Sequence, residues 1–209
     1  MKSEKLKVKS IIESPFKNKS LTFALRVVKL TIFHFSLFTF NLTAQDVFLT
    51  TNGHISFFSD GVIENITAVN DQVTGYINIE NGTIAFVLLV KAFRFEKALM
   101  QEHFNENYME SHIHPKAKFS GSVTNFLAID FKKAGRYPAT VNGELTIHGI
   151  TRNITVEGIL EVAAGGITGS CKFPIRVADY EIKIPRIMMQ NIAEVVEVTL
   201  QMDFKPKAN

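Results

Sequence analysis

Residues 47–204 alternate mainly between apolar and polar side chains, and this period of two restricts the fold more than any other feature of the sequence. In Val195–Phe204 every even position is apolar, whereas the odd positions from Glu197 onward are polar. Such a period indicates β-strands with one buried face and one solvent-exposed face, as in antiparallel sheets. We predict strands at Val73–Glu80, Thr83–Phe93, Lys116–Asn125, Thr140–His148, Ile154–Ala163, Ile167–Ile175 and Val195–Phe204.

Pairs of residues that tolerate positive φ interrupt the alternation and mark chain reversals or bulges. They are Asn52-Gly53, Asp60-Gly61, Asn70-Asp71, Asn81-Gly82, Asn142-Gly143 and Gly165-Gly166. Seven or eight antiparallel strands must protect their edges, and closure into a barrel removes the edges altogether. A two-sheet sandwich satisfies the same alternation, so the period by itself leaves both architectures open.

One segment, Glu96–Glu110, departs from the strand pattern. Its apolar residues have helical spacing, and it contains no β-branched residue. We predict one or more short helical turns here, between strands. The apolar side of these turns would close one end of a barrel.

The first 44 residues have the order of a secretory signal peptide. Eight basic and two acidic residues precede the apolar stretch Leu30–Phe40, and cleavage after the small residue Ala44 would release a domain at 45–209. The apolar stretch is shorter than the about 20 residues that span a bilayer, although an uncleaved anchor is the competing interpretation. We therefore expect a periplasmic or secreted protein with no stable membrane anchor after cleavage.

Charge and motifs exclude several classes of function. The whole chain has a net charge of +3, but residues 45–209 hold 15 basic and 18 acidic residues, which does not favour nucleic-acid binding. Cys171 is the single cysteine, so it forms no disulfide within the chain, and its alternating context predicts a small core residue. The sequence shows no nucleophile motif, paired carboxylates or phosphate-binding loop, so we expect neither an enzyme nor a cofactor.

Three stretches resemble the YceI family of polyisoprenoid-binding, lipocalin-like proteins. The most specific is Gly143–Val156, GELTIHGITRNITV, in which two alternating strands flank a glycine-containing turn. Phe104–Phe119 and Val177–Ile182 are similar to two further family segments, with His114 in place of a usual Tyr before the proline. The resemblance covers residues 47–204. It implies an all-β fold, an elongated eight-stranded antiparallel lipocalin-like barrel with a short helical segment between strands.

The resemblance also implies a polyisoprenoid or another long-chain lipid as the partner, held inside the barrel. Burial yields about 0.8 kcal/mol per CH₂, so a fully enclosed isoprene unit contributes roughly 3 kcal/mol. Three or four units then outweigh an association cost on the order of 4–15 kcal/mol. We predict that inward-phase apolar residues and the helical segment line the tunnel: Phe86, Leu88, Phe93, Phe95, Met100, Phe104, Tyr108, Phe119, Val123, Leu145, Ile147, Ile154, Val156, Phe173, Val198 and Leu200.

Three histidines give the nearest approach to a metal centre. His112 and His114 would share a strand face, and His103 would have to approach from the helical turns. No cysteine and no well-spaced acid completes a zinc set with them, so no metal site is predicted. His148 belongs to the hairpin that carries the resemblance, and a structural hydrogen bond is its expected role.

Three hypotheses from different classes follow. The favoured one is non-enzymatic binding, storage or transport of a polyisoprenoid (prenylquinone-like) or similar amphiphilic lipid in the barrel interior. The alternative is a structural or partner-binding β-domain with a filled core and no cargo, which a solid interior would favour. The third is an enzyme that acts on a lipid inside the barrel, which requires a polar dyad buried against the tunnel. A homodimer stays open.

Overall fold

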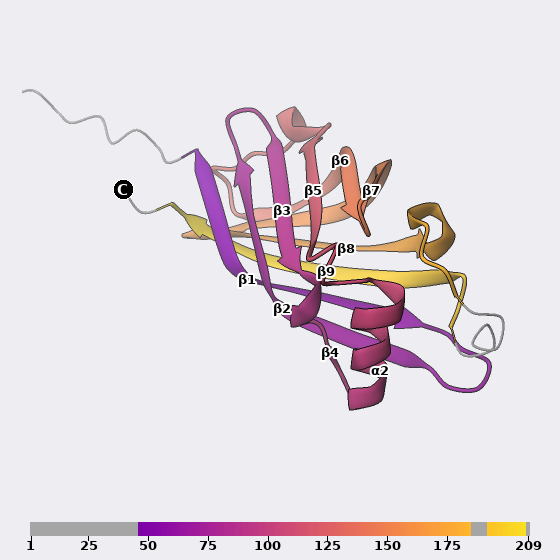
Figure 1. Cartoon of the computed structure of the whole chain (residues 1–209). Coiled ribbons are helices and arrows are strands. Elements are labelled where there is room, and N and C mark those ends of the chain that lie inside the picture. The colour runs from indigo at the N-terminus through magenta and orange to yellow at the C-terminus, as the bar shows by residue number, and fades with distance from the viewer. Residues whose placement is uncertain (1–45, 185–191, 208–209) are drawn as a thin grey trace, which may run out of the picture. The chain divides into compact units, whose positions relative to one another are not determined.

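The alternating stretches pair into a closed antiparallel barrel in the computed structural model, which describes residues 46–184 and 192–207 (Figure 1). Neighbouring strands follow the order β1-β9-β8-β7-β6-β5-β3-β2, and pairing of β1 with β2 closes the ring. Within the described residues the barrel strands are β1 Val47–Ser59, β2 Ile66–Asn78, β3 Thr83–Leu89, β5 Lys116–Val123, β6 Gly135–Ile147, β7 Ile150–Ala163, β8 Gly166–Arg176 and β9 Val195–Pro206. Closure confirms the predicted eight-stranded barrel and decides against a sandwich.

The connection from β3 to β5 is helical, as predicted. It contains the 3-10 turn η1 (Val90–Ala92), the two-residue strand β4 (Arg94–Phe95), α2 (Ala98–His103) and the π-helical η2 (Phe104–Tyr108). β4 pairs with β2, and α2 follows it near the ends of β3 and β5 (Figure 1). The strand predicted at Thr83–Phe93 was too long, because η1 ends the pairing with β5. Two further 3-10 turns follow β5 and β8, namely η3 (Phe126–Ala128) and η4 (Val177–Tyr180).

Five of the predicted turn pairs are confirmed, three at connections between strands and two as bulges. Asp60-Gly61 connects β1 to β2, Asn81-Gly82 connects β2 to β3, and Gly165-Gly166 lies at the β7–β8 turn. Gly82 and Gly165 have φ values of 74° and 87°, which glycine adopts without strain. Asn52-Gly53 lies at a register shift of β1, so this pair marks a bulge rather than a reversal.

Asn70-Asp71 also marks a bulge rather than a reversal, because β2 continues through it while Asp71 and Gln72 lie opposite the single residue His54 at a register shift between β1 and β2. The side chain of Asn70 is fully buried and donates a hydrogen bond to the carbonyl oxygen of Leu89 at 3.0 Å. This bond satisfies the amide inside the sheet, where an unpaired polar group would be costly. A residue type that favours turns is thus accommodated in a strand by a partner distant in the sequence.

The turn predicted at Asn142-Gly143 was wrong, because both residues lie inside β6. Gly143 pairs across the sheet with Gly121 of β5. A Cβ atom built on either glycine would lie 2.7 or 2.8 Å from Cζ of Phe119, whose ring covers the pair. Glycine occurs at these positions because two backbones and an aromatic ring approach closely, not because the chain reverses.

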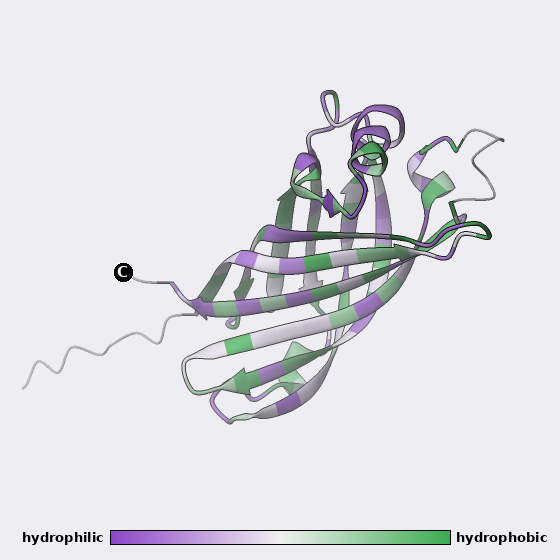
Figure 2. Cartoon of the chain, turned by 90° about the horizontal axis from the view of Figure 1, so that it is seen from below, coloured by the Kyte–Doolittle hydropathy of each residue, from purple (hydrophilic) through white to green (hydrophobic). Residues whose placement is uncertain are grey.

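The inward faces of the strands form one apolar core. Ile77 is completely buried, and Met202 and Phe204 are each 1% exposed. Figure 2 shows the alternation along the strands as bands of hydrophobic and hydrophilic residues. The two-residue period therefore separates a buried face from a wet face, as the sequence predicted.

The leader at 1–44 and its cleavage after Ala44 lie outside the described residues. Cleavage and export therefore stay predictions. Within the described residues, none of the helices combines the length and the apolar character needed to cross a lipid bilayer.

Candidate ligand-binding cavity

A cavity of about 320 Å³ lies inside the barrel. Its wall draws residues from all eight barrel strands and from the helical connection, and almost all of the wall is apolar. The volume is at the lower end of the roughly 300–1,000 Å³ of small-molecule pockets. The interior is therefore hollow enough for a ligand, which argues against the alternative of a completely filled core.

Most of the residues predicted to line a tunnel meet in this wall. The structure brings together Phe86, Leu88, Phe93, Phe95, Met100, Phe104, Tyr108, Phe119, Leu145, Ile147, Ile154, Val156, Phe173, Val198 and Leu200. Val123 is not among the wall residues, because it is packed in the adjacent core and is only 2% exposed. Whether the wall residues contact a lipid stays a prediction.

Several further residues of the wall were not predicted from the sequence. Met202 and Phe204 lie at even-numbered positions of the same strand as Val198 and Leu200. The alternation, followed to the end of the strand, therefore predicts that they also point inward. Ile55 and Phe57 of β1 also line the cavity. Their strand escaped prediction because the bulge after Thr50 and the exposed Phe58 interrupt its alternation.

Four phenylalanine rings pack together where the helical connection meets the barrel. Phe104 of η2 lies 4.9 Å from Phe95, 5.6 Å from Phe93 and 5.6 Å from Phe57 between ring centroids. Such pairs contribute about 0.5–1.5 kcal/mol each beyond the area that they bury. The cluster holds the helical connection against β1, and with Met100 and Tyr108 it shapes one part of the cavity wall, as predicted.

A second aromatic row crosses the interior. The ring of Phe86 on β3 lies 6.0 Å from that of Phe119 on β5 and 6.1 Å from that of Phe204 on β9. β3 and β9 are not neighbours in the sheet, so the contact between Phe86 and Phe204 spans the bore. The phenylalanines therefore narrow the interior at this level but leave the cavity open elsewhere.

The few polar groups of the wall gather mainly on one side. Ser59, Glu64, His103 and Tyr108 come from the end of β1, the β1–β2 connection and the helical connection. Burial raises the pKa of the Tyr108 hydroxyl, so Tyr108 is neutral and able to donate a hydrogen bond at physiological pH. An amphiphile would be stabilised with its head near these groups and its apolar tail along the rest of the wall.

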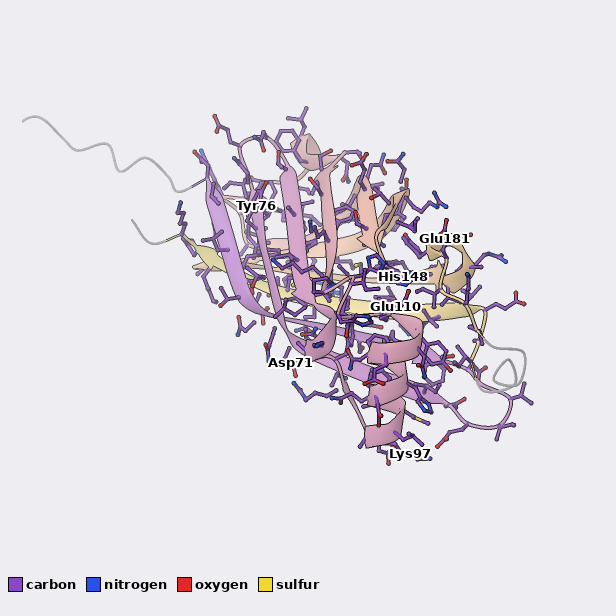
Figure 3. All side chains as sticks on the ribbon, viewed as in Figure 1. Asp71, Tyr76, Lys97, Glu110, His148 and Glu181 are labelled. Carbon is purple, nitrogen blue, oxygen red and sulfur yellow. The ribbon has the colours of Figure 1, made fainter. Side chains whose placement is uncertain are left out.

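An ion pair ties this polar side together. The ammonium group of Lys97, at the start of α2, bonds to the carboxylate of Glu64 in the β1–β2 connection. The hydrogen bond to Glu64 holds the pKa of Lys97 above its usual value. Figure 3 labels Lys97 at the outer end of the helical connection. Both side chains are exposed, so the pair positions the segment and contributes little stability.

Cys171 lies in the cavity wall, and burial raises the pKa of its thiol to about 11. Because the thiolate is the reactive form, we expect Cys171 to react with a polar disulfide reagent on the order of 100-fold more slowly than free cysteine at about pH 8. Absorbance after addition of Ellman's reagent measures this rate, with the urea-unfolded protein as the control. Equal rates for the folded and the unfolded protein would contradict the burial of this thiol.

The histidines are arranged differently from the sequence expectation. His103 faces the cavity and His112 is exposed, whereas His114 lies beside His148 with 4.6 Å between the ring centroids. Nε2 of His148 lies 2.9 Å from a carboxylate oxygen of Glu110. Nδ1 of His148 makes the expected structural hydrogen bond, to the backbone carbonyl oxygen of Tyr180 at 3.1 Å, whereas its contact with Glu110 was not predicted.

The fold and the cavity define the class of protein, a closed antiparallel β-barrel with an apolar interior and a helical connection. Residues 40–204 match the YceI-like domain family, and the chain belongs to that family. This match confirms the resemblance noted in the sequence. Among curated protein sequences, none matches the chain.

Solved structures share the architecture. A polyisoprenoid-binding domain from Saccharophagus degradans, implicated in plant cell wall breakdown, has a TM-score of 0.68 at 15% identity over 78% of this chain and 100% of that one. BcnA of Burkholderia cenocepacia has a TM-score of 0.61 at 14% identity, and the match covers 72% of this chain and 95% of BcnA. A YceI protein of Campylobacter jejuni has a TM-score of 0.55 at 12% identity, and the match covers 69% of this chain and 87% of that protein. At these identities the likeness concerns the fold alone.

Proposed function

We propose that this protein binds a polyisoprenoid, such as a prenylquinone, or a similar long-chain amphiphile in its barrel, and stores or carries it without chemical conversion. The proposal rests on the apolar cavity of about 320 Å³ that is lined by all eight barrel strands and the helical connection. Membership of the YceI-like family and the polyisoprenoid-binding domain among the structural neighbours support the same class of ligand.

The chemistry of the wall suits an uncharged chain. Each enclosed isoprene unit contributes roughly 3 kcal/mol through burial of its five carbons. A few units therefore offset the cost of association, on the order of 4–15 kcal/mol, without a charged anchor. The polar head would lie near His103 and Tyr108, where the wall offers hydrogen-bonding groups.

The proposed setting is the periplasm or the exterior of the cell. The signal-like leader at 1–44 supports it, because a carrier of membrane lipids outside the cytoplasm needs export. The slightly acidic domain at 45–209 is consistent with a protein that does not bind nucleic acid.

Native mass spectrometry of the protein purified from its own host tests the proposal. We expect an added mass that corresponds to a prenyl lipid, and uptake of one prenylquinone per chain after delipidation. A hydrophilic quinone without a prenyl tail is the control ligand and should bind far more weakly. Repeated recovery without lipid, together with no uptake of prenylquinone in vitro, would refute the proposal and favour a cargo-free β-domain.

A further inference from the structure

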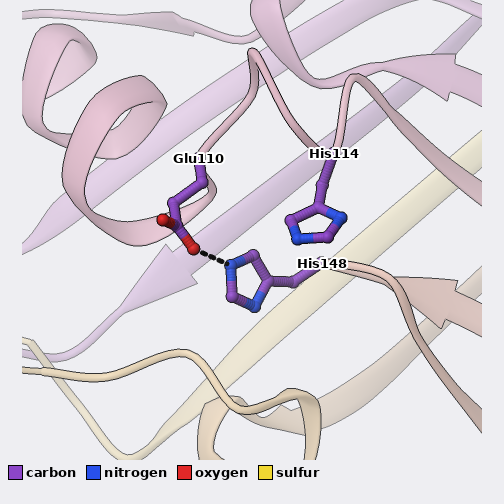
Figure 4. A group of neighbouring side chains, drawn as sticks. All are labelled: Glu110, His114 and His148. Carbon is purple, nitrogen blue, oxygen red and sulfur yellow. Dashed lines mark hydrogen bonds and ion pairs between the residues drawn. The ribbon is translucent and has the colours of Figure 1, made fainter.

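Glu110, His114 and His148 form a compact cluster outside the cavity wall (Figure 4). One ligand atom from each side chain lies within 4.8 Å of the other two. Glu110 and His114 belong to the loop between η2 and β5, and His148 belongs to the turn between β6 and β7. Two imidazoles and one carboxylate from two separate segments thus converge on one point.

The loop that carries Glu110 and His114 is shaped by its own backbone. The amides of Ile113 and His114 both donate to the carbonyl oxygen of Glu110, at 2.8 and 2.9 Å. The loop also packs tightly on the hairpin, because a Cβ atom on Gly149 would lie 2.8 Å from Cε1 of His114. The rings of His114 and His148 are consequently held edge to face at 4.6 Å.

His148 has a backbone conformation that few residues other than glycine adopt. His148 and Gly149 have φ values of 50° and 76°, the left-handed conformation that a tight two-residue hairpin turn needs. Glu110 also has a positive φ, at 42°. Non-glycine residues in this conformation are strained, and such strain concentrates at functional sites. Two of the three cluster residues therefore occupy strained positions.

The hydrogen bonds of His148 orient its ring toward the cluster. Nδ1 lies 3.1 Å from the backbone carbonyl oxygen of Tyr180, which only accepts, so Nδ1 carries the proton. In the neutral ring Nε2 then presents a lone pair to the Glu110 carboxylate 2.9 Å away. Two groups that both carry lone pairs repel unless a proton or a cation lies between them. A histidine that ligates a metal characteristically donates its other N–H to a carbonyl in this way.

We propose that Glu110, His114 and His148 bind a divalent first-row transition metal ion, for which Zn²⁺ is the best match. Imidazole nitrogens exclude a dedicated Mg²⁺ or Ca²⁺ site, since those ions take oxygen ligands. Two histidines and a glutamate are a common three-residue zinc set that leaves a fourth position for water. The side chain of His148 is only 11% exposed, so the site is partly shielded from solvent.

The ion would join three parts of the fold that are distant in the sequence. It would bridge the loop that ends the helical connection to the β6–β7 hairpin, and through the Tyr180 carbonyl to η4. We therefore assign it a structural role at the side of the barrel where Tyr108 and Ile147 reach the cavity. The proposal does not depend on the lipid-binding function.

Calorimetric titration of the purified, EDTA-stripped full chain with Zn²⁺ tests this inference. We expect one Zn²⁺ ion to bind per chain. When the free Zn²⁺ concentration is a hundredfold above Kd, Tm should rise by roughly 5 °C or more. The variant His114→Gln should weaken binding by about 100-fold. His112→Gln is the matched control, because His112 is exposed, two residues away and outside the cluster, and it should bind as the wild type does.

Three results would overturn the proposal: no Zn²⁺ binding by the folded wild type, equal binding by both histidine variants, or a stoichiometry below one half. The first would identify the contact as an ion pair of protonated His148 with Glu110. If His114→Gln fails to fold, Co²⁺ bound to the wild type decides the question. Visible absorption bands of a four- or five-coordinate ion that Zn²⁺ displaces are expected, and an octahedral aqua-like spectrum would count against the site.

Discussion

Replacing Gly143 by alanine is expected to lower the free energy of unfolding by about 3 kcal/mol, which corresponds to a drop in Tm of roughly 6–12 °C. The added Cβ atom would lie 2.4 Å from the carbonyl oxygen of Ser120 and 2.6 Å from Cα of Gly121. Both obstacles are backbone atoms of β5, which cannot move without disturbing the β5–β6 pairing. Thermal and urea unfolding monitored by circular dichroism measure the change.

The matched control is Gly169→Ala, the same substitution inside strand β8. Its Cβ atom would meet only side-chain atoms, Cδ2 of Leu160 at 3.3 Å and Cε2 of Phe204 at 3.5 Å. Side chains can yield by a few tenths of an ångström, so we expect a change below about 1 kcal/mol. If both variants unfold at the same temperature, the close approach of Gly143 to β5 does not exist in solution.

Replacing Leu145 by tryptophan is expected to weaken prenylquinone binding by about 100-fold. Leu145 lines the cavity and is the cross-strand partner of Phe119, so a larger ring would fill space next to the aromatic row. Loss of room for one isoprene unit removes roughly 3 kcal/mol of burial, which is about two powers of ten in Kd. Native mass spectrometry with a graded prenylquinone concentration measures the affinity.

Glu144→Trp is the control, since successive residues of a strand point to opposite faces and Glu144 is exposed. The chain has no other Trp, so the introduced indole reports its own surroundings. Its emission should be shifted to the blue in Leu145→Trp and remain at the position of a solvated indole in Glu144→Trp. Unchanged affinity in a folded Leu145→Trp protein would show that the prenyl chain does not occupy this part of the barrel.

Much of the fold was predictable because the signal is local. The even-numbered apolar residues from Val196 to Phe204 give a strand in any antiparallel arrangement. The absence of β-branched residues from Glu96 to Glu110 likewise identified the helical connection. The error at Asn142-Gly143 has a tertiary cause. Asparagine and glycine favour turns, but the close approach of Gly143 to Gly121 keeps this pair in a strand.

The candidate cavity was predictable as a set of residues, but not as a space. The inward phase of the strands selected ten of its wall residues and the helical segment five more, whereas Val123 was misplaced because it packs in the adjacent core. No local sequence pattern determines the distance between the inward faces of opposite strands. The same sequence pattern would also allow the rings of Phe57, Phe95 and Phe104 to pack in the centre of the barrel and fill its interior.

The sequence by itself determined the strand period, the helical interruption, the inward phase and the family, because each depends on neighbouring residues or on a contiguous motif. Only the tertiary structure decided that the ring closes around a hollow and that His148 meets Glu110, 38 residues away. Closure of the barrel and contacts between residues distant in the sequence depend on strand order, register and the packing of large aromatic rings. These quantities arise from the whole barrel at once, so no single stretch of the chain contains them.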